Sequence, residues 1–204
     1  MKLTTMTQIT LDGVVQGNGA ASEEDRRGGF ERGGWALGAG DDQTRTLINE
    51  TYQRADAFLF GRGTYDLFAG SWGTAPQMQA HPVGAALNST PKYVASTTLT
   101  EPRWENTTVL SGDLAKAVGE LKAAPGGELQ VHGSGTLIRS LLELGLVDEM
   151  TFLVIPVILG QGKRLFPDSG PDLALKLIDS RVDSKGVTIQ VFRPNGRPQY
   201  PAAA

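Results

Sequence analysis

The sequence contains no cysteine and only two histidines among its 204 residues. The absence of cysteine excludes a disulfide framework, a thiolate nucleophile and a cysteine-ligated metal site. His81 and His132 lack the spacing of shared metal ligands, so we predict no metal site. No apolar run approaches the roughly 20 residues that span a bilayer, and a net charge of −3 argues against nucleic-acid binding. Because no secretory leader is visible, we expect a cytoplasmic protein with no membrane partner.

Short apolar segments alternate with helical patterns along the chain. We expect strands at 3–15, 57–60, 92–96, 107–110, 128–132, 149–155, 173–182 and 186–192. Helices are expected at 42–54 (with Asp42 as N-cap), 64–69, 114–124 and 136–144, with a long loop at 16–40 and an irregular connection at 70–88. This order predicts one α/β domain over residues 1–194, with a mixed, mostly parallel sheet closed by an antiparallel hairpin. The Pro-rich segment 195–204 is expected to be a flexible tail.

One pattern occurs twice: an apolar strand, a glycine-rich turn and a helix. The first turn is Gly61-Arg62-Gly63-Thr64 and the second is Gly133-Ser134-Gly135-Thr136. A helix N-terminus offers unpaired backbone N–H groups and a partial positive charge, and glycine lets a ligand approach them closely. Two such termini in one small domain favour a ligand with more than one phosphate, such as a dinucleotide. Each turn taken alone is equally compatible with a structural corner between strand and helix.

Neither turn carries the fingerprint of a known phosphate loop. The sixth position of the dinucleotide fingerprint is Asp66 in the first turn and Ile138 in the second, and no Gly-Lys-Ser/Thr ending of a P-loop is present. Ser134 is not in a nucleophile elbow, because His132 and Thr136 stand where that motif needs glycine. His132 ends an apolar strand, which favours a hydrogen-bonded core histidine over a catalytic one.

Several side chains near the strand ends have two interpretations. Arg62 follows a strand at the edge where ligands of open α/β sheets gather. Its guanidinium suits a phosphate, specifically the 2′-phosphate that distinguishes NADP from NAD, and the alternative is a solvated arginine. Asp12 is either a turn residue or a substrate contact. Trp35, Tyr65 and Trp72 either line a pocket for planar rings or pack in the core.

Motifs along roughly residues 1–194 resemble those of one family. They are Thr10-Leu11-Asp12-Gly13, Gly34-Trp35, Phe60-Gly61-Arg62-Gly63-Thr64-Tyr65 with Trp72, Lys92-Tyr93-Val94-Ala95-Ser96, Val131-His132-Gly133-Ser134-Gly135-Thr136-Leu137, Gly145-Leu146-Val147-Asp148-Glu149, and Pro156-Val157-Ile158-Leu159-Gly160-Gln161-Gly162 with Leu165-Phe166. In this order they resemble the dihydrofolate reductase-like superfamily, and specifically the reductase domain of the bifunctional riboflavin-biosynthesis deaminase–reductase. That domain acts as a 5-amino-6-(5-phosphoribosylamino)uracil reductase. The resemblance implies a central mixed sheet of about eight strands with flanking helices, and a homodimer.

The same resemblance implies NADPH as the cofactor and assigns its contacts. The 2′-phosphate end of the adenosine would be held by Gly61, Arg62, Thr64 and Ser96, the pyrophosphate by Gly133, Ser134, Gly135, Thr136 and Leu137, and the nicotinamide would lie near Val15. Asp12 and Trp35 are the expected substrate contacts, and no catalytic residue is assigned.

Two departures from the family narrow the function. Dihydrofolate reductases carry an acidic residue on their first long helix, and residues 23–42 offer no clear equivalent, which argues against dihydrofolate as the substrate. The zinc signature of the deaminase is also missing. We therefore expect an NADPH-dependent reductase that transfers a hydride to a small heterocyclic or carbonyl substrate. The alternatives are a non-catalytic dinucleotide-binding or redox-sensing homodimer, and a small-molecule-binding homodimer that has lost NADPH.

Overall fold

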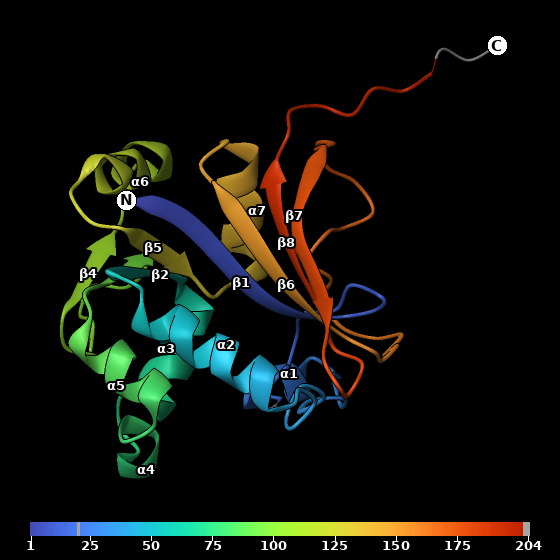
Figure 1. The fold of residues 1–204 in the computed structure, drawn as a ribbon. Helices are drawn as coiled ribbons and strands as arrows, with labels where there is room; N and C mark the ends of the chain where they lie inside the picture. Colours follow the sequence, from blue (N-terminus) through green and yellow to red (C-terminus); the bar gives the residue numbers. More distant parts are fainter. Residues whose placement is uncertain (20, 202–204) are drawn as a thin grey trace.

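Eight strands form one sheet in the computed structural model, which describes residues 1–19 and 21–201 (Figure 1). The strands are β1 (Lys2–Thr10), β2 (Ala57–Gly61), β3 (Lys92–Ala95), β4 (Thr107–Leu110), β5 (Glu128–Val131), β6 (Glu149–Ile155), β7 (Leu175–Val182) and β8 (Thr188–Pro194). Their order is β4-β3-β2-β5-β1-β6-β8-β7. Neighbouring strands from β4 to β6 are parallel, whereas β8 is antiparallel to both β6 and β7. The expected mixed, mostly parallel sheet with antiparallel closing strands is therefore confirmed.

The sheet separates two clusters of buried apolar side chains, each covered by helices. The helices are α1 (Glu23–Arg27), α2 (Asp42–Gln53), α3 (Arg62–Ser71), α4 (Pro76–Gln79), α5 (Pro82–Ser89), α6 (Leu114–Ala123) and α7 (Gly135–Glu143). Phe58 and Phe60 of β2 belong to the cluster with α2, α3 and α5, whereas Leu59 belongs to the cluster with Val118 of α6 and Ile138 of α7. Because side chains alternate along a strand, these two groups of helices cover opposite faces of the sheet (Figure 1).

Some boundaries differ from those expected from the sequence. Segment 70–88 is not irregular, because it contains α4 and α5, which begin at Pro76 and Pro82. Proline suits the first helical position, since it has no N–H to donate and its φ is already helical. Helix α3 begins at Arg62 rather than at residue 64, and α2 is capped by Asp41 rather than Asp42. The expected loop at 16–40 includes the short helix α1.

After β8 the chain extends away from the body of the fold (Figure 1). The start of this segment is paired with the residue before β7. The Asn195 N–H donates to the Ala174 carbonyl at 2.8 Å, and the Ala174 N–H donates to the Gly196 carbonyl at 2.9 Å. The tail expected at 195–204 is therefore tied to the hairpin as far as Gly196. Its flexibility stays a prediction, and residues 202–204 lie outside the described residues. Within residues 1–19 and 21–201, no helix is long and apolar enough to cross a membrane, and no three His, Cys, Asp or Glu side chains gather as a metal site.

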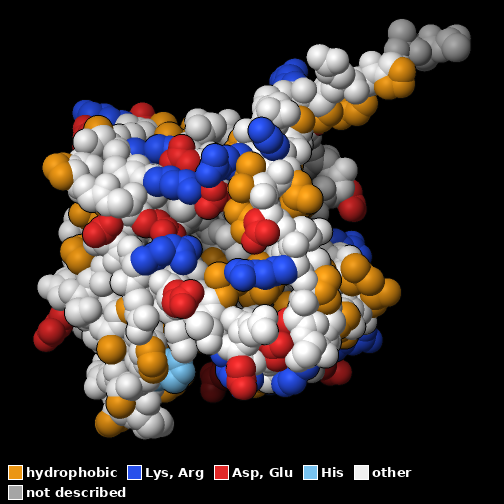
Figure 2. Space-filling view, in the orientation of Figure 1, with side chains coloured by type: hydrophobic (Ala, Val, Ile, Leu, Met, Phe, Trp, Pro, Cys, Tyr) orange, Lys and Arg blue, Asp and Glu red, His pale blue; other side chains and the backbone are white. Residues whose placement is uncertain are grey.

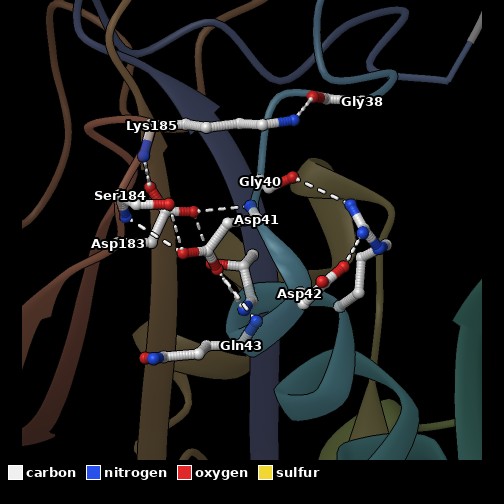
Figure 3. Close-up of polar contacts among 10 residues, drawn as sticks. Gly38, Gly40, Asp41, Asp42, Gln43, Asp183, Ser184 and Lys185 are labelled. Carbon is white, nitrogen blue, oxygen red and sulfur yellow. Dashed lines mark hydrogen bonds and ion pairs between the residues drawn. The ribbon is translucent and has the colours of Figure 1, made fainter.

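Asp41 joins the start of α2 to the turn between β7 and β8 (Figure 3). One carboxylate oxygen caps the helix by accepting from the Gln43 and Thr44 N–H groups at 2.9 and 3.0 Å. The other accepts from the Ser184 N–H at 3.0 Å and from its hydroxyl at 2.8 Å. Hydrogen bonds from Ser184 and Thr44 lower the pKa of Asp41 to about 2, so this carboxyl is ionised at neutral pH.

Asp183 makes the reciprocal connection from the hairpin to the helix (Figure 3). One of its oxygens accepts from the Asp41 N–H at 2.9 Å and from the Thr44 hydroxyl at 2.8 Å. The other accepts from the N–H groups of Lys185 and Val187 at 2.9 and 2.8 Å. Burial alone would raise the pKa of Asp183, but these hydrogen bonds outweigh it and hold the pKa below its usual 3.8. We call Asp41 and Asp183 the carboxylate clamp.

We expect Asp183→Ala to lower the free energy of unfolding by about 1–3 kcal/mol, because the buried Val187 N–H loses its acceptor. A carboxyl whose pKa is lowered by folding stabilises the protein above its unfolded pKa, and this contribution is lost as the pH falls below 3.8. The difference in free energy of unfolding between the wild type and Asp183→Ala should therefore become smaller in acid. Urea unfolding from about pH 3 to about pH 7 measures both effects.

The matched control is Asp179→Ala, which removes an exposed carboxylate from the same hairpin. It should change the free energy of unfolding by no more than about 0.5 kcal/mol. An equal loss in both variants would mean that the clamp does not hold the hairpin to α2.

Candidate functional site

The two glycine turns are in direct contact at the carboxyl edge of the sheet. Strand β2 pairs with β5, and the Gly61 N–H donates to the Gly133 carbonyl at 3.1 Å. A Cβ on Gly61 would clash with Ser134, and one on Gly133 would lie 2.9 Å from the Thr64 hydroxyl oxygen. Gly133 also has a φ of +138°, which side chains rarely adopt. The glycines at these two positions are therefore needed for the turns to interlock.

A helix begins at each turn and directs backbone N–H groups to the same edge. Gly61 is the N-cap of α3 and makes no side-chain cap, whereas Ser134 caps α7 by accepting from the Leu137 N–H at 3.4 Å. Gly135 and Thr136 form the first turn of α7, where N–H groups have no intrahelical partner. Leu137 differs from the other predicted phosphate contacts, because its side chain is buried in the core between the sheet and α7.

The second turn also meets the chain that follows β1. A Cβ on Gly135 would lie 3.3 Å from a methyl carbon of Val15, whose N–H donates to the Lys163 carbonyl at 3.0 Å. Arg139 lies on the same side, with its guanidinium donating to the Thr136 hydroxyl at 3.2 Å and to the Leu165 carbonyl at 3.1 Å. Arg139 was not among the site residues predicted from the sequence. Its spacing of three residues from Thr136 on one helix was the available signal.

Arg62 and Ser96, which the sequence assigns to the same end of the cofactor, line one shallow depression. The depression has a volume of about 360 Å³ and is lined by Arg62, Ala95, Ser96, Thr97, Thr98, Leu110, Gly112 and Leu114. The Arg62 guanidinium donates to Asp66 at 2.7 Å and to the Thr98 hydroxyl at 3.4 Å. The side chains of Arg62 and Asp66 are 40% and 52% exposed, so solvent screens this ion pair and it contributes little. A phosphate can replace Asp66 at small cost.

Asp12 holds the loop that follows β6 against the end of β1. Its carboxylate accepts from the Thr10 hydroxyl at 2.6 Å and from the N–H groups of Leu159 and Gly160 at 3.1 and 2.8 Å. Led by the Thr10 bond, these contacts lower the pKa of Asp12 to about 2. Asp12 is therefore a carboxylate at neutral pH, with both oxygens engaged in the turn. Substrate contact by this residue stays a prediction.

Tyr65 and Trp35, two of the aromatic residues that the sequence offered as pocket or core residues, lie in different environments. Tyr65 belongs to the core, since it is 2% exposed and its hydroxyl accepts from the Trp104 N–H at 3.0 Å. Trp35 is half-buried in the loop after β1, where its indole N–H donates to the Gln16 carbonyl at 2.8 Å. Trp35 packs against apolar residues on both the α2 side and the loop side, so its role as a substrate contact stays a prediction.

His132 differs from the hydrogen-bonded core histidine expected from the sequence. Its ring packs between Tyr52 and Phe68, with centroid distances of 5.2 and 5.6 Å. Its Nδ1 atom is buried and has no hydrogen-bond partner among the described residues. Burial lowers the pKa of His132 to about 4, so the imidazole is neutral at physiological pH. The sequence near His132 could not indicate this environment, because the residues that pack on its ring lie on α2 and α3, in other parts of the chain.

We expect acid to destabilise the protein through His132. Its pKa is about 4 in the folded protein and 6.5 when unperturbed, so the unfolded chain binds more protons between these values. The free energy of unfolding should fall between pH 6.5 and pH 4, by up to about 1.4 kcal/mol per pH unit. In His132→Phe the free energy of unfolding should no longer fall with pH across that interval. Urea unfolding at several pH values measures this slope.

The control is His81→Asn, which changes the other histidine and retains a side chain able to cap α5. It should keep the slope of the wild type. A slope that persists in His132→Phe would show that another group takes up the proton.

Comparisons with known proteins agree on one family. Residues 1–189 match the family model described as the RibD C-terminal domain. The chain is 30% identical over 194 residues to the uncharacterized protein YyaP of Bacillus subtilis (strain 168), covering 92% of each chain.

Solved structures share the fold at low sequence identity. A diaminohydroxyphosphoribosylaminopyrimidine deaminase/5-amino-6-(5-phosphoribosylamino)uracil reductase from Thermotoga maritima has a TM-score of 0.60 and 13% identity, covering 95% of this chain and 56% of that one. A dihydrofolate reductase from Enterococcus faecalis complexed with NADP(H) has a TM-score of 0.60 and 10% identity, covering 95% of this chain and 96% of that one. With a family model that spans nearly its whole length and a dihydrofolate reductase-like sheet, the chain belongs to the RibD C-terminal domain family.

Proposed function

We propose that the protein is an NADPH-dependent oxidoreductase that transfers a hydride to a small heterocyclic or carbonyl substrate. The observation that carries the proposal is the contact between the two glycine turns, which brings two helix N-termini to one edge of the sheet. Membership in the RibD C-terminal domain family supports it, as does the likeness to a dihydrofolate reductase that holds NADP(H).

The residues at this edge fit the parts of NADPH. The first turn of α7 offers N–H groups and a partial positive charge to a pyrophosphate. Arg62 offers a guanidinium to a 2′-phosphate, next to a depression of about 360 Å³ for the adenosine. Gly63 leaves open space beside Arg62, because a Cβ there would meet nothing within 4 Å.

The chain's own residues would bind and orient the reactants rather than exchange protons with them. When bound, NADPH supplies a hydride, and water supplies the proton that completes the reduction. Asp12 is unsuited to donating that proton, because its pKa of about 2 keeps it ionised. Asp183, close to the start of α2, is likewise held as a carboxylate by its hydrogen bonds. Neither residue replaces the helix acid of dihydrofolate reductases, so dihydrofolate is not the proposed substrate.

We expect Arg62→Ala to weaken NADPH binding by about ten- to hundredfold while NADH binding hardly changes. A charge-assisted hydrogen bond contributes roughly 1.5–3 kcal/mol, and 1.4 kcal/mol is about tenfold in affinity. Higher salt should narrow the preference of the wild type for NADPH, because it screens an exposed ion pair. Calorimetric titration with each cofactor measures these effects.

Asp66→Asn is the matched control for this titration. It removes the carboxylate that pairs with Arg62 and should strengthen NADPH binding without changing NADH binding. Equal losses for both cofactors in Arg62→Ala would mean that Arg62 only braces the turn. If the wild type bound neither cofactor, the proposed function would be wrong.

A non-catalytic dinucleotide-binding or redox-sensing protein is the alternative function. It would bind NADPH with the same residues, so cofactor titration does not distinguish it from the reductase. NADPH oxidation, followed by absorbance in the presence of pyrimidine, pterin and carbonyl compounds, separates the two. Turnover of any of these compounds favours the reductase.

We also propose that the protein is a homodimer that pairs through β7. All eight residues of this edge strand are exposed, including Leu175, Leu177, Ile178 and Val182. Hydrophobic side chains are visible over this end of the sheet (Figure 2). Two copies related by a two-fold axis can pair the free edge of β7 in antiparallel fashion, which satisfies backbone groups that would otherwise invite aggregation.

Light scattering at micromolar concentration should therefore give the mass of a dimer, and Leu177→Lys should give a monomer. Leu144→Lys, which alters a leucine that is 45% exposed at the end of α7, should leave the dimer intact. A monomeric wild type would overturn the proposed dimer.

A further inference from the structure

The parts of the candidate site follow one another along the carboxyl edge of the sheet. The depression at Arg62 and Ser96 lies where β2 and β3 end, the second glycine turn follows β5, and Val15 lies in the chain that follows β1. These strands are neighbours in the order β3-β2-β5-β1. A dinucleotide with its 2′-phosphate at Arg62 and its pyrophosphate at the start of α7 therefore carries its nicotinamide toward the chain that leaves β1.

Residues 163–165, which we call the bridging segment, lie against that same chain. The Val15 N–H donates to the Lys163 carbonyl at 3.0 Å. In the opposite direction the Leu165 N–H donates to the Gly13 carbonyl at 2.9 Å. These two hydrogen bonds tie Val15 to the bridging segment, so the place of Val15 depends on what holds the segment.

The bridging segment is fastened to α7 in two ways. The Leu165 side chain is buried in the apolar cluster that includes α7, and a Cβ on Gly135 would lie 3.6 Å from its Cδ1 atom. Arg139, one turn after the start of α7, donates from Nη1 to the carbonyls of Arg164 and Leu165 at 3.4 and 3.1 Å. Its Nη2 donates to the Thr136 hydroxyl at 3.2 Å. The guanidinium therefore spans the space between the segment and the first turn of the helix.

The shape of the guanidinium matters more here than its charge. The three acceptors named above are two main-chain carbonyls and a hydroxyl, none of which is charged. A guanidinium is planar and offers several donors in a fixed fork, whereas the ammonium of lysine is a compact charge on a flexible stem. Lysine at position 139 would keep the positive charge and lose the fork.

We propose that Arg139 is a positioning residue, which places the nicotinamide by holding the bridging segment, and through it Val15, against the start of α7. This inference rests on the proposed function, because it takes the ligand to be a dinucleotide. Arg139 acts through the segment and does not itself touch the nicotinamide. Such positioning matters because a displacement of about 1 Å at a reacting centre can slow a reaction about hundredfold.

Hydrogen exchange of the protein without cofactor tests the mechanical part of the inference. In Arg139→Met we expect the N–H groups of Val15 and Leu165 to exchange about tenfold faster than in the wild type, because the segment that they join opens more often. Arg139→Lys should behave like Arg139→Met. The matched control is Arg45→Met, which removes an exposed arginine from α2 and should leave both exchange rates unchanged. Wild-type rates in Arg139→Met would overturn the inference.

Three ligands of increasing length locate the effect within the site. Adenosine 2′,5′-bisphosphate occupies the adenosine end, 2′-phospho-ADP-ribose adds the pyrophosphate, and NADP⁺ adds the nicotinamide. In calorimetric titrations, Arg139→Met and Arg139→Lys should bind NADP⁺ about tenfold more weakly and the two shorter ligands with wild-type affinity. Arg62→Ala should weaken all three, since each carries the 2′-phosphate.

The remaining outcomes separate this inference from the proposed function. If 2′-phospho-ADP-ribose and NADP⁺ both bind more weakly to Arg139→Met but normally to Arg139→Lys, Arg139 binds the pyrophosphate by its charge and the positioning role is wrong. An equal loss for all three ligands would show that Arg139 only supports the fold. If the three titrations of Arg139→Met match the wild type, the cofactor site stands without this role. If the wild type binds none of the ligands, the proposed function fails and the inference fails with it.

Discussion

The hydrogen bond between the Gly61 N–H and the Gly133 carbonyl holds together the edge on which the candidate site depends. It exists because β2 and β5 are neighbours and because neither turn carries a Cβ at the point of contact. Helices α3 and α7 then begin within a few ångströms of each other and cover opposite faces of the sheet. Two partial positive charges are thereby combined at one place, which suits a ligand with several phosphates. A side chain at either glycine would separate the turns and divide the site.

Most polar side chains around this edge already have partners within the protein. Asp12 holds the loop after β6, Arg62 pairs with Asp66, and Arg139 braces the second turn against the chain near Leu165. Such contacts orient the groups before any ligand arrives, which reduces the entropy lost on binding. The ion pair between Arg62 and Asp66 is exposed and therefore weak. His132 stands apart, because its Nδ1 has no partner within the described residues.

The position of α2 depends on contacts between distant parts of the sequence. Tyr52, which packs on His132, belongs to α2, and the start of α2 is held by the carboxylate clamp. Asp41 and Asp183 are 142 residues apart in the chain, yet each accepts hydrogen bonds from the other's segment. The C-terminal hairpin therefore stabilises the first long helix as well as closing the sheet. A change at Asp183 can therefore disturb the packing of Tyr52 on His132 through α2.

The sequence by itself predicted the eight strands in their order and four of the seven helices of the described residues. Some bounds agree to the residue, such as β4 at 107–110 and β6 at 149–155. Alternation of apolar residues, caps such as Asp113 and the two glycine turns are local signals, which a single segment carries without its neighbours. The placement of β5 between β2 and β1, the face to which His132 points and the partners of Asp183 were decided only by the tertiary structure. Strand pairing joins segments far apart in sequence, and no local pattern specifies which strands meet. For the same reason the motifs could indicate a dinucleotide edge, whereas the buried Nδ1 of His132, which has no hydrogen-bond partner among the described residues, was visible only in the folded chain.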